Sequence, residues 1–296
     1  MSKAIRWQLH FHEAKPDSKN PKHYRVYIYD EQDGSWSGVT QLLGGTSPFT
    51  TDEDSSDDYF APIRVQTGTL TVCTHDEDGN VLITLDDILP ANNISRPVKL
   101  WRLLGGGAVG VLEWQGFLSC EAYDQDYTSI PQIIQLPVIS VLEAMASVEV
   151  SISRMTGLER INKIIYNALH EIDIESGITN FVNIHYDGAT KDIFNKYLDQ
   201  SVLYSTKDSG GYNQLFTLLD ANDCQSVLED ICVFMGWVAR EIGADIYIQC
   251  IKDGAIEMHK QSLSSFYNGI DTFTIESVVE YPIDTIFNNK WRGDSD

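Results

Sequence analysis

Basic residues are scarce in this 296-residue chain: 21 lysines and arginines stand against 43 aspartates and glutamates, and the formal net charge is −22. A field of that sign repels the phosphate backbones of DNA and RNA, which disfavours sequence-specific nucleic-acid binding. An anionic membrane surface is repelled for the same reason. A basic protein neighbour or cations would neutralise the charge, although solubility alone also accounts for it.

Long apolar runs are missing as well. No stretch approaches the roughly 20 apolar residues that a membrane helix needs, so we expect no membrane insertion. Residues 1–12 have neither an apolar core nor a cleavage site. We therefore expect no signal peptide, and synthesis in a cytoplasm.

Cysteines are few, and their spacing does not indicate a disulfide or a metal-binding motif. The five are Cys73, Cys120, Cys224, Cys232 and Cys250, and none forms a C-x-x-C pair. Two of them, Cys224 and Cys232, lie about two turns apart on a predicted helix, which is too far for a disulfide. We expect all five to be small core residues or free thiols.

Apolar residues alternate with polar ones through the first half of the chain, which predicts strands. In the first strand Ile5, Trp7, Leu9 and Phe11 share one face. The predicted strands are 4–12, 24–29, 36–43, 63–73, 81–85, 98–104, 109–120 and 130–136. Between them we expect a polar loop at 44–58, a tight turn at 76–80 and a helical turn at 86–90. Short strands joined by turns predict a mainly antiparallel β-barrel or sandwich.

The second half changes to helical spacing. Helices are predicted over 157–172, 189–199 and 223–237, the last with Asp223 as N-cap and with Gly236 or Gly243 ending it. A hairpin of 244–251 and 255–259 follows, and then possible strands at 271–276 and 278–286. The fold class is thus α+β, with a β-barrel-like domain over 1–137 and a helix-rich α/β domain over 138–269. Residues 270–296 begin a further β segment or return strands to the first barrel.

Motifs follow one another in a particular order between Tyr59 and Met145. A Pro62-Ile63 entry leads into an alternating strand, and the strand motif Trp114-Gln-Gly-Phe-Leu118 follows. Next comes Tyr127-Thr-Ser-Ile-Pro131, a strand that runs into a short helix. This order resembles the N-terminal part of tail hub and tail-tip proteins of phages and prophages of the Bacteroides type.

A second resemblance to that family lies further along the chain. The helix Cys224-Gln-Ser-Val-Leu-Glu-Asp-Ile-Cys232, the strand at 245–249 and the turn with Gly254 are similar to the family's "Cys–x–x–Val–Leu–Glu–x–Ile–Cys" helix and strand pair. Together the two matches touch more than half of the chain. Family members commonly continue into a second barrel, so the chain is either a short member or an N-terminal part.

The resemblance implies a structural component of a phage tail tip or baseplate hub, or of a related contractile injection particle. Such a virion protein is made in the bacterial host cytoplasm and is not an enzyme. It assembles with itself, favouring a trimer, and joins the tail tube to the tip or spike. The strands 24–29 and 109–120, or the acidic loops, would meet the neighbouring proteins.

Two alternatives remain open at this point. One is a carbohydrate- or host-receptor-binding module that presents Trp7, Trp36, Trp101 or Trp114 on an exposed sheet. These tryptophans are first expected to be core or barrel-face residues. The other alternative is the N-terminal part of a tail-associated peptidoglycan hydrolase, with its catalytic domain beyond residue 296.

Several short motifs were weighed as sites, and we predict no catalytic, cofactor-binding or metal-binding residue. The acidic loop 52–58 lacks the residue order of a dedicated Ca²⁺ loop, so a solvated or partner-facing loop is favoured. His10 and His12 point to one face of a strand, but a metal site needs further ligands. His23 and His75 are candidates for those ligands, but the sequence does not place them beside His10 and His12.

The remaining motifs also have plain structural explanations. The glycines at 105–107 and Gly110 lack the Lys-Ser/Thr of a P-loop and suit a hairpin tip. His170, Glu171 and Asp173 are expected as a charged helix end. The Arg-Gly-Asp-Ser sequence at 292–295 is taken as chance.

Overall fold

The computed structural model describes residues 3–13, 21–53, 61–104, 108–120, 124–125, 133–150, 158–176, 181–185, 197–199, 223–250, 255–262 and 278–282. The chain divides into two compact units. The first comprises Met1–Ser55, Val65–Ser147 and Ile172–Ile178, and the second comprises Ser56–Arg64, Val148–Glu171 and Thr179–Asp296. The α+β class with an N-terminal barrel is confirmed, while the exact domain limits at 137 and 269 stay a prediction.

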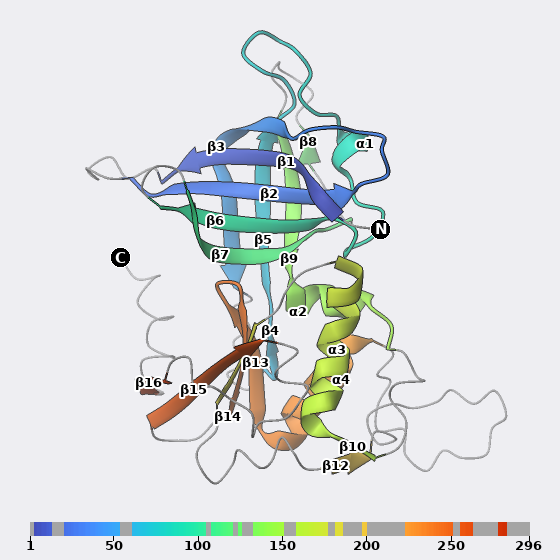
Figure 1. The fold of residues 1–296 in the computed structure, drawn as a ribbon, viewed down its shortest axis with the longest axis vertical. Helices are drawn as coiled ribbons and strands as arrows, with labels where there is room; N and C mark the ends of the chain where they lie inside the picture. Colours follow the sequence, from blue (N-terminus) through green and yellow to red (C-terminus); the bar gives the residue numbers. More distant parts are fainter. Residues whose placement is uncertain are drawn as a thin grey trace, which may run out of the picture. The chain divides into compact units, whose positions relative to one another are not determined.

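The first unit is a closed barrel of seven strands. These are β1 (Lys3–His12), β2 (His23–Glu31), β3 (Thr40–Glu53), β5 (Gln66–Cys73), β6 (Pro97–Leu103), β7 (Val109–Leu118) and β9 (Ile133–Ser140). Their order is β5-β3-β1-β2-β6-β7-β9, and pairing of β5 with β9 closes the ring. Only the β1–β3 pair is parallel, and the short β8 (Asp124–Gln125) adds to β9. In Figure 1, β1, β2, β6 and β7 cross in front of β5 and β9.

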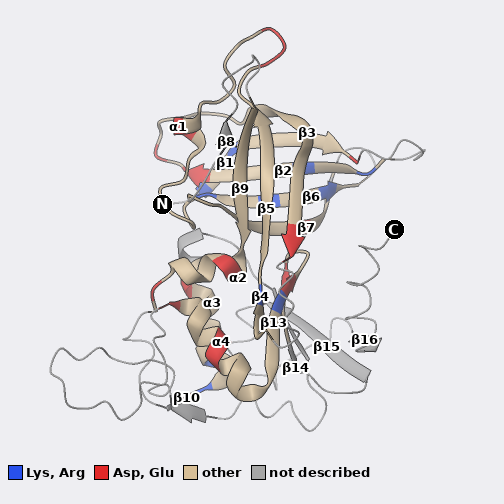
Figure 2. Cartoon of the chain, turned by 180° about the vertical axis from the view of Figure 1, so that it is seen from behind, with Lys and Arg blue, Asp and Glu red and all other residues tan. Residues whose placement is uncertain are grey.

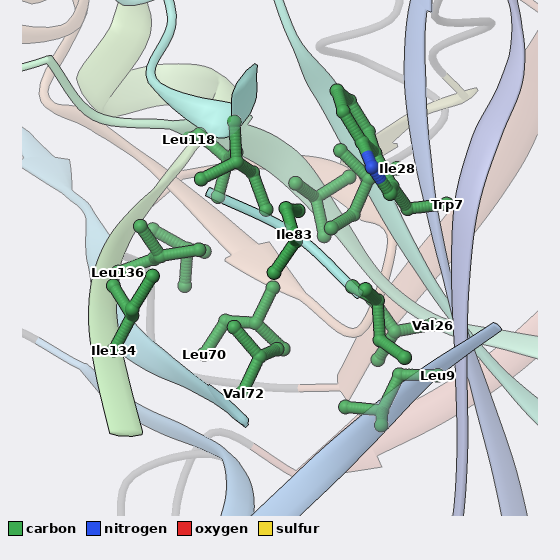
Figure 3. Close-up of a cluster of buried hydrophobic side chains, with 14 of the residues drawn as sticks. Trp7, Leu9, Val26, Ile28, Leu70, Val72, Ile83, Leu118, Ile134 and Leu136 are labelled. Carbon is green, nitrogen blue, oxygen red and sulfur yellow. The ribbon is translucent and has the colours of Figure 1, made fainter. Parts of the chain in front are cut away.

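The barrel interior is filled by the apolar face of each strand. Trp7 and Leu9 point inward from β1 as the alternation predicts, and Phe11 packs against the same cluster. The buried cluster consists of Trp7, Leu9, Val26, Ile28, Leu42, Leu70, Val72, Ile83, Ile88, Val98, Trp114, Leu118, Ile134, Leu136 and Val138. Figure 3 shows these side chains converging from several strands, with Ile83 near the middle. Ile83 lies outside the strands, so a connecting segment completes the core.

Strand β3 is displaced and longer than predicted. It begins at Thr40 and continues through residues 44–53, which we had assigned to the loop 44–58. Its register against β5 shifts between Gly44 and Phe49. Past this irregularity the ring of Phe49 packs edge-on against Trp114, with ring centroids 5.2 Å apart. Burial of this aromatic ring and pairing with β5 extend a strand that looks too polar in the sequence.

The predicted strand 63–73 is two strands that serve different sheets. The dipeptide β4 (Ile63–Arg64) pairs with β13 (Trp237–Ile242) in the second unit, and β5 starts only at Gln66. Alternation in the sequence continues through the break, because both pieces are extended. A periodic pattern therefore does not reveal that the strand changes sheets.

The predicted strand 81–85 is also wrong. Val81 makes only an isolated bridge with His75, and the helical turn α1 (Leu85–Ile88) already begins at its end. The Thr84 hydroxyl accepts a hydrogen bond from the main-chain N–H of Asp87, which starts this turn. The helical turn predicted at 86–90 is thus present, slightly earlier.

The predicted passage from a strand into a short helix is confirmed. Strand β9 continues past the predicted limit of 136 to Ser140, whose side chain caps α2 (Val141–Ala144). A 3-10 turn, η1 (Met145–Ser147), follows. The Ser140 hydroxyl also accepts a hydrogen bond of 3.1 Å from the main chain of Gln66. One serine therefore joins the end of β9 to the start of β5.

The second unit contains a six-stranded sheet of order β16-β15-β11-β14-β13-β4. Its remaining strands are β11 (Phe181–His185), β14 (Asp245–Cys250), β15 (Ala255–Ser262) and β16 (Val278–Pro282). The predicted hairpin of 244–251 with 255–259 is wrong in its pairing, because β11 lies between β14 and β15. The strand expected at 278–286 is described as far as Pro282, and the one expected at 271–276 lies outside the described residues.

Two helices and a small two-stranded sheet remain to be described, and the first helix spans both units, which divide between Glu171 and Ile172. The predicted helix 157–172 is α3 (Ile161–Ser176), and its apolar positions Ile161, Ile164, Ile165, Ala168, Leu169 and Ile172 are buried. The predicted helix 189–199 is wrong at its end, since Tyr197–Asp199 is strand β12, paired with β10 (Leu158–Arg160). The rest of that predicted helix lies outside the described residues.

Helix α4 (Cys224–Met235) begins and ends where its capping residues predict. Asp223 Oδ1 accepts a 2.8 Å hydrogen bond from the N–H of Ser226, and Gly236 takes the left-handed conformation at φ 65°. The chain then enters β13 at Trp237, a strand that the sequence pattern did not reveal.

Replacing Asp223 by alanine is expected to lower the free energy of unfolding by about 1 kcal/mol, because the first turn of α4 loses its cap. Asp223→Asn is the matched control, since its side-chain oxygen still accepts the bond from Ser226. Urea unfolding monitored by circular dichroism measures both variants. Equal losses in the two variants would contradict a capping role.

Candidate functional site

An arginine cluster lies where β1, β2 and the segment before β6 meet. Asp30 Oδ2 lies 2.6 Å from Arg6 Nη1 and 3.5 Å from Arg96 Nη2. Both guanidinium groups also approach the ring of Trp7, at 4.3 and 5.0 Å from its centre. Burial lowers the pKa of Arg96, and Arg96 donates a hydrogen bond to the main-chain oxygen of Asp87. These groups satisfy one another, so the cluster serves to hold the barrel together.

The outer face of the barrel carries a second group, which we call the basic–aromatic stripe: Arg25, Tyr27 and Tyr29 of β2, with Lys99 and Trp101 of β6. In the register of the two strands, Arg25 faces Trp101 and Tyr27 faces Lys99. Lys99 Nζ lies 5.5 Å from the centre of the Tyr29 ring, and all five side chains are half-buried. Arginine and aromatic residues are enriched in protein interfaces. In Figure 2 the blue of Lys and Arg residues marks positions on β2 and β6.

The alternation in the sequence predicted the strand at 24–29 but not this stripe. The sequence contained the signal, because the apolar residues Val26 and Ile28 alternate with Arg25, Tyr27 and Tyr29. In the structure Val26 and Ile28 are fully buried. Burial of one face of a strand places the alternate residues on the other. The partners on β6 depend on long-range pairing, which no local pattern contains.

A third group, the histidine cluster, consists of His10, His12 and His23 at the ends of β1 and β2. The ring of His23 lies 5.7 Å from that of His10 and 6.2 Å from that of His12, between centroids. Burial lowers the pKa of His10, with further contributions from Arg25, His23 and His12. The fourth candidate, His75, is elsewhere, with Nδ1 2.7 Å from the Thr74 hydroxyl. Among the described residues, no three His, Cys, Asp or Glu side chains are placed as a ready-made metal site.

The acidic motifs have structural roles where they are described. Asp76 Oδ1 accepts hydrogen bonds from the N–H groups of Asp78 and Asn80, at 3.0 and 2.8 Å, and Gly79 has a φ of 82°. The Asn80 side chain lowers the pKa of Asp76. The turn predicted at 76–80 is therefore confirmed. Of the acidic loop, Asp52 and Glu53 belong to β3, and 54–58 lie outside the described residues.

The glycine-rich segment of the sequence falls between β6 and β7, which pair antiparallel. Leu104 N–H donates a 2.8 Å hydrogen bond to Ala108 O across the connection. The glycines at 105–107 and the sequence at 292–295 lie outside the described residues.

The histidine–carboxylate group of α3 is not at a helix end, because α3 continues to Ser176. His170 stacks on Tyr166 with ring centroids 4.7 Å apart. Glu171 is half-buried and contributes to the raised pKa of Cys224. The side chain of Asp173 is outside the described part. His170 and Glu171 therefore have different surroundings on α3.

The described cysteines are free, in agreement with the sequence prediction. Burial raises the pKa of Cys224 and of Cys232 to about 12. A thiol with such a pKa stays protonated at neutral pH and is a poor nucleophile. These two cysteines therefore act as small core residues.

The tryptophans do not form an exposed platform. Trp7 and Trp114 are buried in the barrel core, as the structural interpretation predicted. Trp36 and Trp101 are half-buried, and Trp36 Nε1 donates a 3.1 Å hydrogen bond to Glu31 O. Two of the four rings are thus unavailable for stacking on a sugar.

Helix α4 presents exposed apolar side chains near its end: Phe234 is 70% and Val233 is 65% exposed. On the same helix, burial and the neighbours Glu229 and Asp223 raise the pKa of Asp230 to about 6. The carboxylate form of Asp230 therefore weakens the folded state as the pH rises toward neutrality. The described part of the chain has no helix long and apolar enough to span a bilayer.

No protein-family model matches the chain, and no curated protein matches it. Among solved structures, the chain is similar to the crystal structure of the 43 kDa tail protein of prophage MuSo2 from Shewanella oneidensis. The TM-score is 0.40 and the sequence identity 9%, over 85% of this chain and 54% of that one. The chain thus spans about half the length of the structure that it matches.

Proposed function

We propose that this chain is a structural component of a phage-type tail, at the tail tip or baseplate hub or in a related contractile injection particle. In this proposal it is a virion protein, made in the bacterial host cytoplasm, that assembles with itself and joins the tail tube to the tip or spike. It acts through its surfaces and is not an enzyme. The support comes from the two sequence resemblances and from what their residues do in the fold.

One observation carries the proposal: the motif Trp114-Gln-Gly-Phe-Leu118 lies where β7 pairs with β9 in the barrel. Gly116, Phe117 and Leu118 pair with β9, and Phe117 also faces Pro97 of β6. A β-carbon on Gly116 would lie 2.1 Å from Ile139 O. The motif that resembles tail hub proteins is therefore used to build a barrel, which suits a scaffold that presents surfaces to its neighbours.

The basic–aromatic stripe is the contact that we propose for self-assembly. Strand β2 is hydrogen-bonded to β1 and to β6 on its two edges, so a partner meets its outward side chains. The net charge of −22 makes most of the surface of a second copy attractive to Arg25 and Lys99. If the stripe of one copy binds a different surface of the next copy, the contact is head-to-tail. Repetition of such a contact around an axis closes a ring, such as the favoured trimer.

Light scattering across a concentration series at low and moderate salt tests this assembly. We expect a discrete trimer for the natural chain. The Lys99→Glu trimer should dissociate on dilution, or at a concentration of added salt at least tenfold lower than the natural trimer requires. The charge change places a carboxylate where an acidic partner surface is expected. Lys22→Glu, at an exposed position away from the stripe, is the matched control and should leave the mass unchanged.

A monomer at every concentration would overturn intrinsic self-assembly. A trimer that Lys99→Glu leaves intact would keep the assembly but remove the stripe as its contact. Circular dichroism of each variant shows that the barrel is folded in these comparisons.

The glycan-binding alternative is less well supported, because Trp7 and Trp114 are buried. The hydrolase alternative depends on a catalytic domain beyond residue 296. None of the described residues specifically favours either function.

A further inference from the structure

One side of helix α4 combines acidic and apolar side chains, and we call it the α4 face: Glu229, Asp230, Val233 and Phe234. The opposite side of the helix is buried and consists of Val227, Leu228, Ile231 and Cys232. Among the described large apolar side chains, those of Phe234 and Val233 are the most exposed, at 70% and 65%. Helix geometry places each of them one turn beyond a carboxylate. The α4 face is therefore an outward surface with two acidic groups beside two apolar ones.

The carboxylates of the α4 face have no cationic partner within the described segments. The ion pairs found there are made by other basic residues: Arg6, Arg96, Arg102 and Lys163, each with a carboxylate outside α4. Uncompensated negative charge beside exposed apolar groups suits a partner that offers cations and apolar rings together.

The basic–aromatic stripe of a second copy has this chemistry. It carries two cations, Arg25 and Lys99, among three aromatic rings on the outer face of β2 and β6. The spacings also match. Residues two apart on a strand are separated by about 6.8 Å, and residues four apart on a helix rise by about 6 Å. A helix laid along β2 can therefore set its carboxylates beside a cation of one row while its apolar side chains cover a ring of the next.

We propose that the stripe of one copy binds the α4 face of the next copy, with Lys99 beside Glu229 or Asp230. This inference rests on the self-assembly proposed above, and it names the second surface that a head-to-tail contact requires. The two surfaces differ, so an open row of copies leaves one of each unpaired at its ends. A closed ring pairs them all.

The turn before Val81 is a useful comparison, because it also sets carboxylates near an exposed apolar side chain. Val81 is 61% exposed, and Glu77 and Asp78 are exposed as well. The turn offers a single valine, however, and no helical row of side chains that could follow the stripe. It therefore serves as the control surface.

Exchange of charges between the two surfaces tests the contact, by light scattering of the full chain across a concentration series. Glu229→Lys and Lys99→Glu should each raise the concentration needed for half assembly at least tenfold, because each brings like charges together. The double variant restores opposite charges and should assemble within about threefold of the natural concentration. Glu77→Lys is the matched control, since it changes the net charge equally at an exposed position. It should not restore assembly to Lys99→Glu.

The apolar half of the contact is tested by Phe234→Ala, which should also weaken assembly about tenfold, because a ring covered on assembly is lost. Val81→Ala is its control and should leave the mass unchanged. Urea separates the copies before each chain unfolds, so the contact does not contribute to the unfolding of the single chain.

Zero-length cross-linking with a carbodiimide locates the contact, because it joins an amine to a carboxylate only where the two touch. In a mixture of isotopically labelled and unlabelled chains, we expect Lys99 joined to Glu229 or Asp230 of a different copy. A trimer that is insensitive to Glu229→Lys would overturn this contact and keep self-assembly. So would a double variant that fails to assemble, or Lys99 joined instead to Glu77 or to a carboxylate of 52–58. A monomer at every concentration would overturn both proposals.

Discussion

Replacing Gly116 by alanine is expected to destabilise the barrel by about 3 kcal/mol. The added β-carbon would lie 2.1 Å from Ile139 O and 2.5 Å from a ring carbon of Trp114. The first neighbour is main chain of β9, which cannot move aside without disturbing the pairing of β7 with β9. The single methyl group that alanine adds would therefore push β7 away from β9.

Gly38→Ala is the matched control for this prediction. A β-carbon there meets nothing within 4 Å, so only the positive φ of 81° is strained, at about 1–2 kcal/mol. Urea unfolding followed by tryptophan fluorescence compares the two, because Trp7 and Trp114 are buried in the barrel. A loss at Gly116 no larger than that at Gly38 would show that β7 and β9 are not in close contact there.

Local chemistry allowed most of the elements to be predicted from the sequence. The alternation of Trp7 and Leu9 with polar residues identified β1, and Asp223 and Gly236 marked both ends of α4. These signals depend only on residues a few positions apart. The barrel class followed from the succession of such strands.

Long-range pairing is what the sequence did not provide. Val182 of β11 pairs with Ile246 of β14, across a separation that no periodicity reports, and so β11 came to lie between two strands predicted as a hairpin. The break at Val65 is hidden for a similar reason, since both sides of it are extended.

The candidate sites follow the same division. The sequence placed His10 and His12 on one face, because strand geometry requires it. Only the register of β1 against β2 brings His23 beside them and leaves His75 elsewhere. Likewise, β2 alone offers Arg25 and its tyrosines, and the pairing with β6 turns them into a stripe.

Replacing Phe117 by alanine is expected to lower the free energy of unfolding by about 3–5 kcal/mol. Phe117 is fully buried, and it lies between Pro97 of β6 and Ile139 of β9 in the strand registers. Truncation removes a large apolar contact and leaves a cavity where β7 pairs with β9, and neighbouring main chain limits collapse there.

The chain supplies its own control in Phe234, which is 70% exposed on α4. Phe234→Ala removes the same atoms, yet the stability should change by no more than about 0.5 kcal/mol, because the ring is already largely in water. Urea unfolding of both variants distinguishes burial from residue type. A large loss at Phe234 would mean that its ring is covered in the folded protein in solution, and would make that end of α4 an interface. A small loss at Phe117 would instead show that the barrel's stability does not depend on this buried aromatic residue.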